Sequence, residues 1–274
     1  MRQAGVLARG FAALCLAALA GCQSQPASEG IVWQIDNQHN EPHGDWNRLG
    51  VTDLLIQWTA VDDTAFVSGT TLREAQRLPD WRRIAAEPWA NSVLVGLAGR
   101  FDERAARANA TQLVEQSLQL VAAAPPLHIE GWYFPVEVDP SWQDARSLAP
   151  LLERLPRPLW ISVYDRSNIG GKALADWLDS WLPHDVGVLF QDGVGVYARE
   201  PRVARDYADA LAVTLGKARV RVIAEVFRPG PNQTFRSATA AELMPQLKAY
   251  HGYRTYLFDG PHYVSPELVE ELLK

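Results

Sequence analysis

Acidic side chains stand at, or just after, the ends of three short apolar runs of this chain. They are Glu137, Asp192 and Glu225. Two carboxyl groups that flank one glycosidic bond can hydrolyse it, because one protonates the leaving oxygen while the other acts as base or nucleophile. We therefore predict that Glu137 and Glu225 form a catalytic pair. Asp192 would bind a hydroxyl group or assist.

Amides and aromatic rings stand at the ends of the other apolar runs, and the chain holds 10 Trp. Aromatic faces stack on the C–H faces of sugars, while amides and carboxylates bind their hydroxyl groups. The predicted substrate-binding residues are Trp33, Gln34, Gln57, Trp58, Trp132, Tyr133, Tyr164, Gln191 and Asp259. Any one ring could instead pack between strands and helices, so this prediction depends on the set. The predicted partner is a carbohydrate polymer or oligosaccharide.

Eight runs rich in apolar, β-branched or aromatic residues are candidates for the strands that position these groups. They are 31–35, 53–58, 92–97, 127–134, 159–164, 186–190, 220–226 and 254–258. Segments with helical spacing lie between most of them, at 103–124, 144–155, 172–182, 201–217 and 240–251, and a last one at 266–273 closes the chain. The runs recur at about the length of one strand-plus-helix unit.

Apolar strands that alternate with amphipathic helices indicate a parallel sheet covered by helices, and eight such units favour a closed barrel. Only residues 41–50 separate the first two runs, which is room for a turn or two of helix. The predicted fold class is therefore α/β, a single (β/α)8 TIM barrel with a shortened first helix. Function in this fold sits at the carboxyl ends of the strands, where the residues named above would meet.

The first 21 residues read as a signal peptide, because two arginines precede an apolar run that small residues follow. Leu19-Ala20-Gly21-Cys22 resembles the bacterial lipobox, which implies that Cys22 is acylated. Residues 22–30 would form a flexible tether and 31–274 the barrel domain. Gln23 stands where an inner-membrane retention signal has Asp, so we expect an anchor in the outer membrane, on its periplasmic side.

The composition of the chain argues against several kinds of partner and site. The net charge is −6 at pH 7, which argues against a nucleic-acid partner, because phosphate binding needs clustered Lys and Arg. The two cysteines, Cys15 and Cys22, fall in the leader and at the predicted anchor, so no disulfide is expected. Gly193 and Gly195 lack the third glycine of a dinucleotide fingerprint. We expect no cofactor, and a turn that lets Asp192 face the pocket.

Further histidine and acidic residues could have metal-binding or structural roles. His39 and His43 are four residues apart between Asp36 and Asp45, but Pro42 and Gly44 interrupt the stretch, so we expect a loop without a metal. A metal-dependent polysaccharide deacetylase is the alternative that this stretch leaves open. His262 could line the pocket, although a lone histidine is more often a surface or packing residue. Glu130, inside a strand, is expected to form a structural ion pair with Arg221.

Two segments carry a resemblance to a known family. Gly131-Trp132-Tyr133-Phe134-Pro135-Val136-Glu137 and Phe190-Gln191-Asp192-Gly193-Val194-Gly195 resemble motifs of a bacterial family of unknown function, regarded as glycoside-hydrolase-like TIM barrels. Leu55-Ile56-Gln57-Trp58 is also similar. The placement of Glu137 after the fourth strand and Glu225 on the seventh resembles that of retaining glycosidases. This resemblance implies that Glu137 is the general acid/base and Glu225 the nucleophile, although those enzymes usually carry Asn where Val136 stands here.

The alternative function is a non-catalytic carbohydrate-binding lipoprotein for exopolysaccharide or envelope handling. A third possibility is an envelope structural lipoprotein, which predicts no cleft. Carboxyl groups that face one cleft favour the enzyme, whereas carboxyl groups paired with Arg or Lys favour binding. The fold class alone does not decide, because this barrel hosts many functions.

Overall fold

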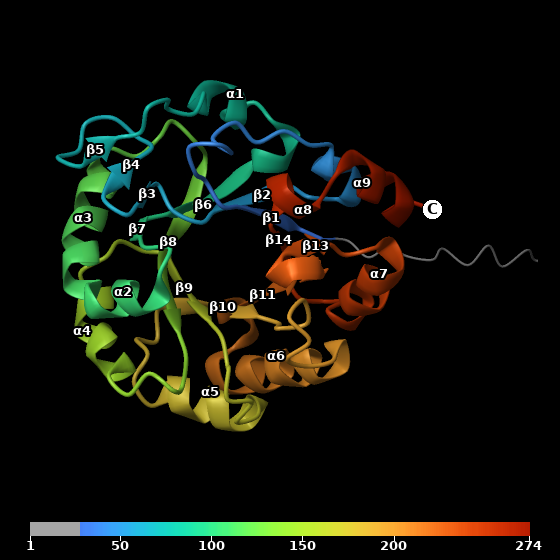
Figure 1. Ribbon diagram of the computed structural model, residues 1–274. Coiled ribbons are helices and arrows are strands. Elements are labelled where there is room, and N and C mark those ends of the chain that lie inside the picture. The colour runs from blue at the N-terminus through green and yellow to red at the C-terminus, as the bar shows by residue number, and fades with distance from the viewer. Residues whose placement is uncertain (1–27) are drawn as a thin grey trace, which may run out of the picture.

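The computed structural model describes residues 28–274, so the predicted signal peptide and the predicted lipidation site at Cys22 lie outside the described residues. Eight parallel strands close into a barrel (Figure 1). They are β1 (Gly30–Trp33), β2 (Asp53–Ile56), β6 (Ser92–Gly96), β8 (Ile129–Val138), β9 (Leu159–Val163), β10 (Val186–Gln191), β11 (Val220–Glu225) and β14 (Thr255–Phe258). The strand β1 pairs with both β2 and β14, which closes the barrel. The predicted TIM barrel is confirmed.

Helices surround the strands, as Figure 1 shows. The α-helices are α1 (Trp81–Ala85), α2 (Glu103–Ala108), α3 (Ala110–Ala122), α4 (Ala149–Leu152), α5 (Gly171–Asp179), α6 (Pro201–Leu215), α7 (Ala240–Ala249), α8 (Gly260–Tyr263) and α9 (Pro266–Leu272). Between β1 and β2 the chain forms only the 3₁₀ turn η1 (Trp46–Leu49), so the shortened first helix is confirmed. A Thr239 capping box with Glu242 starts α7, and Ser265 caps α9.

The segment expected as one helix over residues 103–124 is two helices. Asn109 has φ −113° and ψ 19°, outside the helical region, and its side-chain amide donates to the carbonyl of Ala105 at 2.8 Å. Asparagine competes in this way with backbone hydrogen bonds, which is why it favours helix ends. The break leaves α2 as a short separate helix before α3.

The core has two layers because successive strand residues point to opposite faces of the barrel wall. The interior is filled by one residue from each strand: Val32, Leu55, Leu94, Tyr133, Trp160, Leu189, Ile223 and Tyr256. A larger set of buried residues, among them Ile31, Trp33 and Leu54, packs between the strands and the helices. The barrel is therefore filled with side chains and is not a pore.

Two small sheets were not predicted. One joins β3 (Ala60–Val61), β4 (Thr64–Ala65), β5 (Arg73–Glu74) and β7 (Ala98–Gly99), and the other is the hairpin of β12 (Phe227–Pro229) with β13 (Phe235–Ser237). Strands of two or three residues are too short to give a period-2 pattern. Three strands of the first sheet lie in the long connection between β2 and β6, and its fourth strand, β7, follows β6.

The amino ends of the strands carry an ion-pair cluster. Glu130 contacts Arg221 and Arg254, each at 2.9 Å, and Arg254 also pairs with Asp53. The predicted ion pair between Glu130 and Arg221 is confirmed. Burial opposes ionisation of Glu130, but the hydrogen bond from Arg254 and the charge of Arg221 lower its pKa to about 2. This end of the barrel has a structural function.

Before β1, the last residues of the predicted tether contact the barrel. Ser28 is buried, and the Glu29 carboxylate accepts the main-chain N–H of Thr255 at 2.9 Å. Gly30 is already part of β1, where a side chain would collide with the ring of Tyr256. Among residues 28–274, no helix combines the length and apolar character that crossing a membrane requires.

Candidate active site

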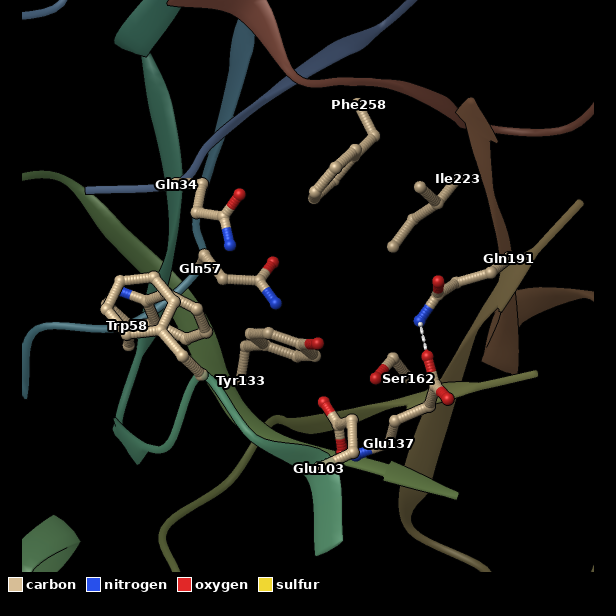
Figure 2. Close-up of a pocket in the computed structure, with 11 residues that line it drawn as sticks. Gln34, Gln57, Trp58, Glu103, Tyr133, Glu137, Ser162, Gln191, Ile223 and Phe258 are labelled. Atoms are coloured by element: carbon tan, nitrogen blue, oxygen red, sulfur yellow. Dashed lines mark hydrogen bonds between the residues drawn. The ribbon is translucent and has the colours of Figure 1, made fainter. Parts of the chain in front are cut away.

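A cavity of ≈ 160 Å³ opens at the carboxyl ends of the barrel strands. It is lined by Gln34, Gln57, Trp58, Phe101, Glu103, Tyr133, Glu137, Ser162, Gln191, Ile223 and Phe258. Figure 2 shows these side chains converging on one space, with Glu103 and Glu137 together on one side and Gln34 and Phe258 on the other. The position agrees with the general location of function in this fold.

Glu103 and Glu137 bring two carboxyl groups into this cavity from neighbouring elements. Glu103 is the first residue of α2, which Asp102 caps, and Glu137 lies near the end of β8. The main-chain N–H of Glu137 donates to Glu103 Oε2 at 3.2 Å, which fixes the two residues relative to each other. The register between β8 and β9 shifts between Phe134 and Val138. Such an irregularity can re-aim a side chain beside a site.

The surroundings raise the pKa of both carboxyl groups. Burial and the nearby charge of Glu137 raise the pKa of Glu103 from 4.5 to about 7. Burial also raises the pKa of Glu137, but the charge of Arg107 and a hydrogen bond from Gln191 act against the shift. The two groups therefore differ in the partners that favour their charged forms, which is the pattern of an acid beside a base.

Two side chains hold Glu137 in place. Gln191 Nε2 donates to Glu137 Oε2 at 3.0 Å, the bond drawn in Figure 2. Arg107 Nε donates to the main-chain carbonyl of Glu137 at 3.1 Å, and its Nη2 lies 3.6 Å from Glu137 Oε1. Glu137 is thus partly paired with a cation, whereas Glu103 forms no ion pair of that kind among the described salt bridges.

Amides, hydroxyls and rings make up much of the remaining wall. Burial raises the pKa of Tyr133, whose hydroxyl is hydrogen-bonded to Ser162 and Gln57. Trp58 and Phe101 meet edge to face with ring centroids 4.9 Å apart. The Phe101 side chain is 52% exposed, although it lies at the cavity. These groups can contact both the hydroxyls and the C–H faces of a sugar.

Half of the residues predicted from the sequence line the cavity and half do not. Those that line it are Gln34, Gln57, Trp58, Tyr133, Glu137 and Gln191. Those that do not are Trp33, Trp132, Tyr164, Asp192, Glu225 and Asp259.

Trp33 and Trp132 lie on the outer side of the barrel wall. Trp33 is fully buried, packs 5.7 Å from the Trp81 ring, and donates from its indole to the carbonyl of His39 at 2.7 Å. Each tryptophan immediately precedes a residue that lines the cavity, Gln34 or Tyr133. Because neighbouring strand residues face opposite ways, one member of each pair points outward.

Asp192 is buried away from the cavity in a complete hydrogen-bond network. Its Oδ2 accepts from Gln246 Nε2 at 2.5 Å and from the Tyr250 hydroxyl at 2.8 Å. Its Oδ1 accepts the main-chain N–H groups of Val194 at 3.1 Å and Glu225 at 3.2 Å. The expectation that the glycine turn lets Asp192 face the pocket is corrected: the carboxylate joins β10 to α7.

The turn after β10 instead covers Glu225. Glu225 Oε2 accepts the main-chain N–H of Val196 at 3.3 Å, and the residue is only 6% exposed. A Cβ on Gly195 would lie 2.6 Å from Glu225 Cβ, so only glycine allows this approach. Burial and the charge of Asp192 raise the pKa of Glu225 to about 8. This carboxyl group lies beneath a loop and not at the cavity wall.

Tyr164 and Asp259 also have other partners. Arg199 stacks over the Tyr164 ring at 5.3 Å. Asp259 is fully buried and caps α8, where its Oδ1 accepts the main-chain N–H of His262 at 2.9 Å. Its Oδ2 accepts the main-chain N–H of Gln34 at 3.3 Å, so Asp259 supports a cavity residue without lining the cavity.

Five residues that line the cavity were not among the predicted site residues, and Glu103 is the one among them that carries a carboxyl group. The sequence did contain one signal for Glu103, which is its position. Glu103 directly follows Gly99-Arg100-Phe101-Asp102, after the third predicted strand. An acidic residue after an Asp at a helix start reads as ordinary N-terminal capping and dipole chemistry. That chemistry accounts for an acidic residue here without requiring it to lie at the barrel mouth.

Comparisons with known proteins give similarity without a family assignment. The uncharacterized protein YbcH of Escherichia coli (strain K12) is 27% identical over 241 residues, which cover 76% of this chain and 80% of YbcH. A solved structure from Bacteroides thetaiotaomicron VPI-5482, described as a putative alpha-L-fucosidase, has a TM-score of 0.58 with 15% identity. That match covers 99% of this chain and 95% of the other. No protein-family model matches. The structural likeness shows the fold alone, a barrel like that of a described glycosidase.

Proposed function

We propose that this protein is a glycoside hydrolase in which Glu103 and Glu137 form the catalytic pair. The observation that carries the proposal is the presence of two carboxyl groups in one cavity, one with its pKa raised to about 7. Two-carboxylate hydrolysis needs one protonated and one ionised group at the same bond. The sequence analysis already predicted a catalytic role for Glu137. In this proposal Glu103 replaces Glu225 as its partner.

In this mechanism Glu103 donates a proton to the leaving oxygen, because its raised pKa keeps it protonated near neutral pH. Glu137, beside Arg107 and Gln191, is the ionised carboxylate. It acts on the anomeric carbon, directly as nucleophile or through an activated water, as the glycosidic bond breaks. The configuration of the first product, read by NMR, distinguishes these two courses.

The substrate would be an oligosaccharide or polysaccharide whose terminal sugar enters the cavity. The three amides of Gln34, Gln57 and Gln191 offer both donors and acceptors to hydroxyl groups, and the wall includes the rings of Trp58 and Phe101. The cavity volume of ≈ 160 Å³ suits a single sugar ring better than a long chain. Because a neighbour in fold is described as a putative alpha-L-fucosidase, α-L-fucosides belong among the substrates tried first.

The envelope location is part of the proposal and rests on the sequence. An acyl chain on Cys22 would hold the barrel at the outer membrane, on its periplasmic side, within reach of envelope or exopolysaccharide sugars. Incorporation of labelled palmitate into the wild-type chain, and its loss in Cys22→Ser, would support this anchor. An unlabelled wild-type chain would contradict it.

The second candidate function is non-catalytic carbohydrate binding, which the contact between Arg107 and Glu137 favours. Cation pairing can hold a carboxylate as a ligand for hydroxyls. The discriminating experiment incubates the purified chain with chromogenic glycosides and envelope polysaccharides and measures release of product and, in parallel, saturable binding. Product release that Glu103→Gln and Glu137→Gln both abolish supports the enzyme. Binding without product in every sample supports the second candidate.

A further inference from the structure

A second polar cluster lies beside the cavity, where the chain leaves β1 and β14. Asp36 and His39 belong to the loop after β1, and His262 belongs to α8, which follows β14. One potential ligand atom from each of these three residues lies within 4.8 Å of the others. The rings of His39 and His262 have centroids 4.0 Å apart. The two strands are hydrogen-bonded neighbours in the barrel, which is why the cluster forms.

The loop that contains Asp36 and His39 places their two side chains next to each other. Asp36 Oδ1 accepts the main-chain N–H groups of Gln38 at 2.6 Å and of His39 at 2.7 Å. His39 Nδ1 lies 3.2 Å from both carboxylate oxygens of Asp36. Two ligand atoms bound to one zinc ion at about 2.1 Å, at the tetrahedral angle, are about 3.4 Å apart. The spacing between Asp36 and His39 is close to that value.

His262 is oriented by a buried carboxylate. Its Nδ1 lies 2.8 Å from Asp259 Oδ2, and the Asp259 side chain is only 1% exposed. With Nδ1 engaged, His262 presents Nε2 on its other edge. Metal-binding histidines commonly give one ring nitrogen to a carboxylate in this way, which fixes the tautomer and the ring orientation. Asp259 is thus an outer support that is independent of the three inner side chains.

We propose that Asp36, His39 and His262 bind a divalent transition-metal ion of the Zn²⁺ class. Two imidazoles and one carboxylate suit such an ion, whereas Mg²⁺ and Ca²⁺ prefer sites made of oxygen atoms. Three protein ligands leave a further position for water or for a substrate oxygen. Asp36 lies two residues after Gln34 and His262 lies four residues after Phe258, and both Gln34 and Phe258 line the cavity. The proposal does not depend on the glycosidase activity.

The donor set differs from the one considered on the sequence. Asp36 and His39 remain, but His43 lies beside Arg83, with its Nδ1 3.5 Å from Nη1, and not in the cluster. His262, more than 200 residues away in the chain, takes the place of the second histidine. His43 is therefore a matched control, because it lies on the same loop and is of the same residue type.

The test is a Zn²⁺ titration by calorimetry of the full-length chain, purified without a histidine tag and stripped with a chelator. We expect one Zn²⁺ per chain. His39→Gln and His262→Gln should each weaken binding by more than about 100-fold, and Asp259→Asn by about 10- to 100-fold. His43→Gln should bind as the wild type does, and Mg²⁺ should give no comparable signal.

The titration can overturn the proposal in three ways. The wild-type chain could fail to bind Zn²⁺ at micromolar concentrations, binding could survive in both His39→Gln and His262→Gln, or His43→Gln could weaken binding as much as they do. Circular dichroism of each metal-free variant shows whether it is folded. Because His39 is in a loop and His262 in a helix, a folding defect in one leaves the other as a valid test.

Discussion

Glu103 and Glu137 share one cavity but meet different partners. Glu103 is half-buried beside another carboxylate and accepts a main-chain N–H, whereas Glu137 lies next to Arg107 and Gln191. Desolvation favours the neutral form of both groups, and the charge of Arg107 favours the charged form of both. Among the described hydrogen bonds, only Glu137 also accepts one from a side chain, that of Gln191, whereas the charge of Glu137 further raises the pKa of Glu103. This difference, and not the mere presence of two acids, supports separate roles as proton donor and ionised carboxylate.

The pH dependence of activity should have two limbs. Turnover needs Glu103 protonated, so kcat/KM should fall as pH rises through about 7. It also needs Glu137 ionised, and its raised pKa places the acid limb above the ordinary value of 4.5. A profile of kcat/KM between about pH 4 and 9 checks this. A rate that stays constant well above pH 7 would be inconsistent with Glu103 as the acid.

Stability should respond to the same group. Between pH 4.5 and about 7 the folded chain holds a proton on Glu103 that the unfolded chain has released, so folding becomes less favourable as pH rises through this range. Glu103→Gln should therefore raise the free energy of unfolding by roughly 1–3 kcal/mol at pH 8 and by much less at pH 5. Urea unfolding at both pH values measures it.

The exposed residue Glu153 provides the control for that experiment. Glu153→Gln should change the free energy of unfolding by less than about 0.5 kcal/mol at either pH. An equal effect of Glu103→Gln at pH 5 and pH 8 would contradict the raised pKa.

At the scale of one residue, the sequence could identify the side chains but not always their direction. Gln34 and Tyr133 line the cavity while the adjacent Trp33 and Trp132 face outward, and the residue types alone suit either side. Glu225, at the end of β11, is buried by the turn that follows β10 and contains Gly195. Contacts of this kind join segments far apart in the chain, so no local pattern reveals them.

At the scale of elements, the turn after β10 and the helix α7 form one unit through Asp192. Four donors converge on its two carboxylate oxygens, two from the main chain and two from α7 or the residue that follows it. Such a network is stable only when every member is satisfied. This network indicates a positioning function for Asp192, whereas the sequence predicted that Asp192 would bind a hydroxyl group or assist catalysis.

The variant Asp192→Asn separates these two functions. The amide nitrogen of the new Asn would face groups that are all hydrogen-bond donors, so one of these contacts would be lost. We therefore expect the free energy of unfolding to fall by roughly 1–3 kcal/mol. Turnover by the folded fraction should fall by less than about tenfold, because Asp192 does not line the cavity. Tyr250→Phe should reproduce part of the stability loss. Abolished turnover with unchanged stability would instead indicate a catalytic residue.

At the scale of the whole molecule, two sets of ionisable residues lie at opposite ends of the barrel. The cavity is at the carboxyl ends of the strands, and the cluster of Glu130, Arg221 and Arg254 is at their amino ends. The eight-unit pattern predicted this architecture because strand and helix periods repeat along the chain. The small sheets and the break at Asn109 escaped prediction, since two-residue strands and one non-helical residue leave no period.

Glu130→Gln should destabilise the fold without altering the site. It removes the carboxylate that pairs with the buried Arg221, and we expect a loss of about 1–3 kcal/mol at pH 7. Because the pKa of Glu130 is lowered to about 2, this contribution is present above pH 4.5 and is lost as pH falls toward 2. Unfolding measured at pH 7 and pH 4 should show the difference narrowing.

The exposed pair of Glu115 and Arg154 is the matched control for that variant. Glu115→Gln should change stability by less than about 0.5 kcal/mol. A change of kcat in Glu130→Gln at a temperature where it is folded would show that the two ends are coupled, against this account.

The most direct test of the central claim is a comparison of turnover in Glu103→Gln, Glu137→Gln and Glu225→Gln on one glycoside that the wild-type chain hydrolyses. The account predicts that the first two lose at least about 10²-fold in kcat. Glu225→Gln should retain turnover within about tenfold, because Glu225 lies beneath the turn after β10. Loss of turnover in Glu225→Gln with activity retained in Glu103→Gln would contradict the proposed pair.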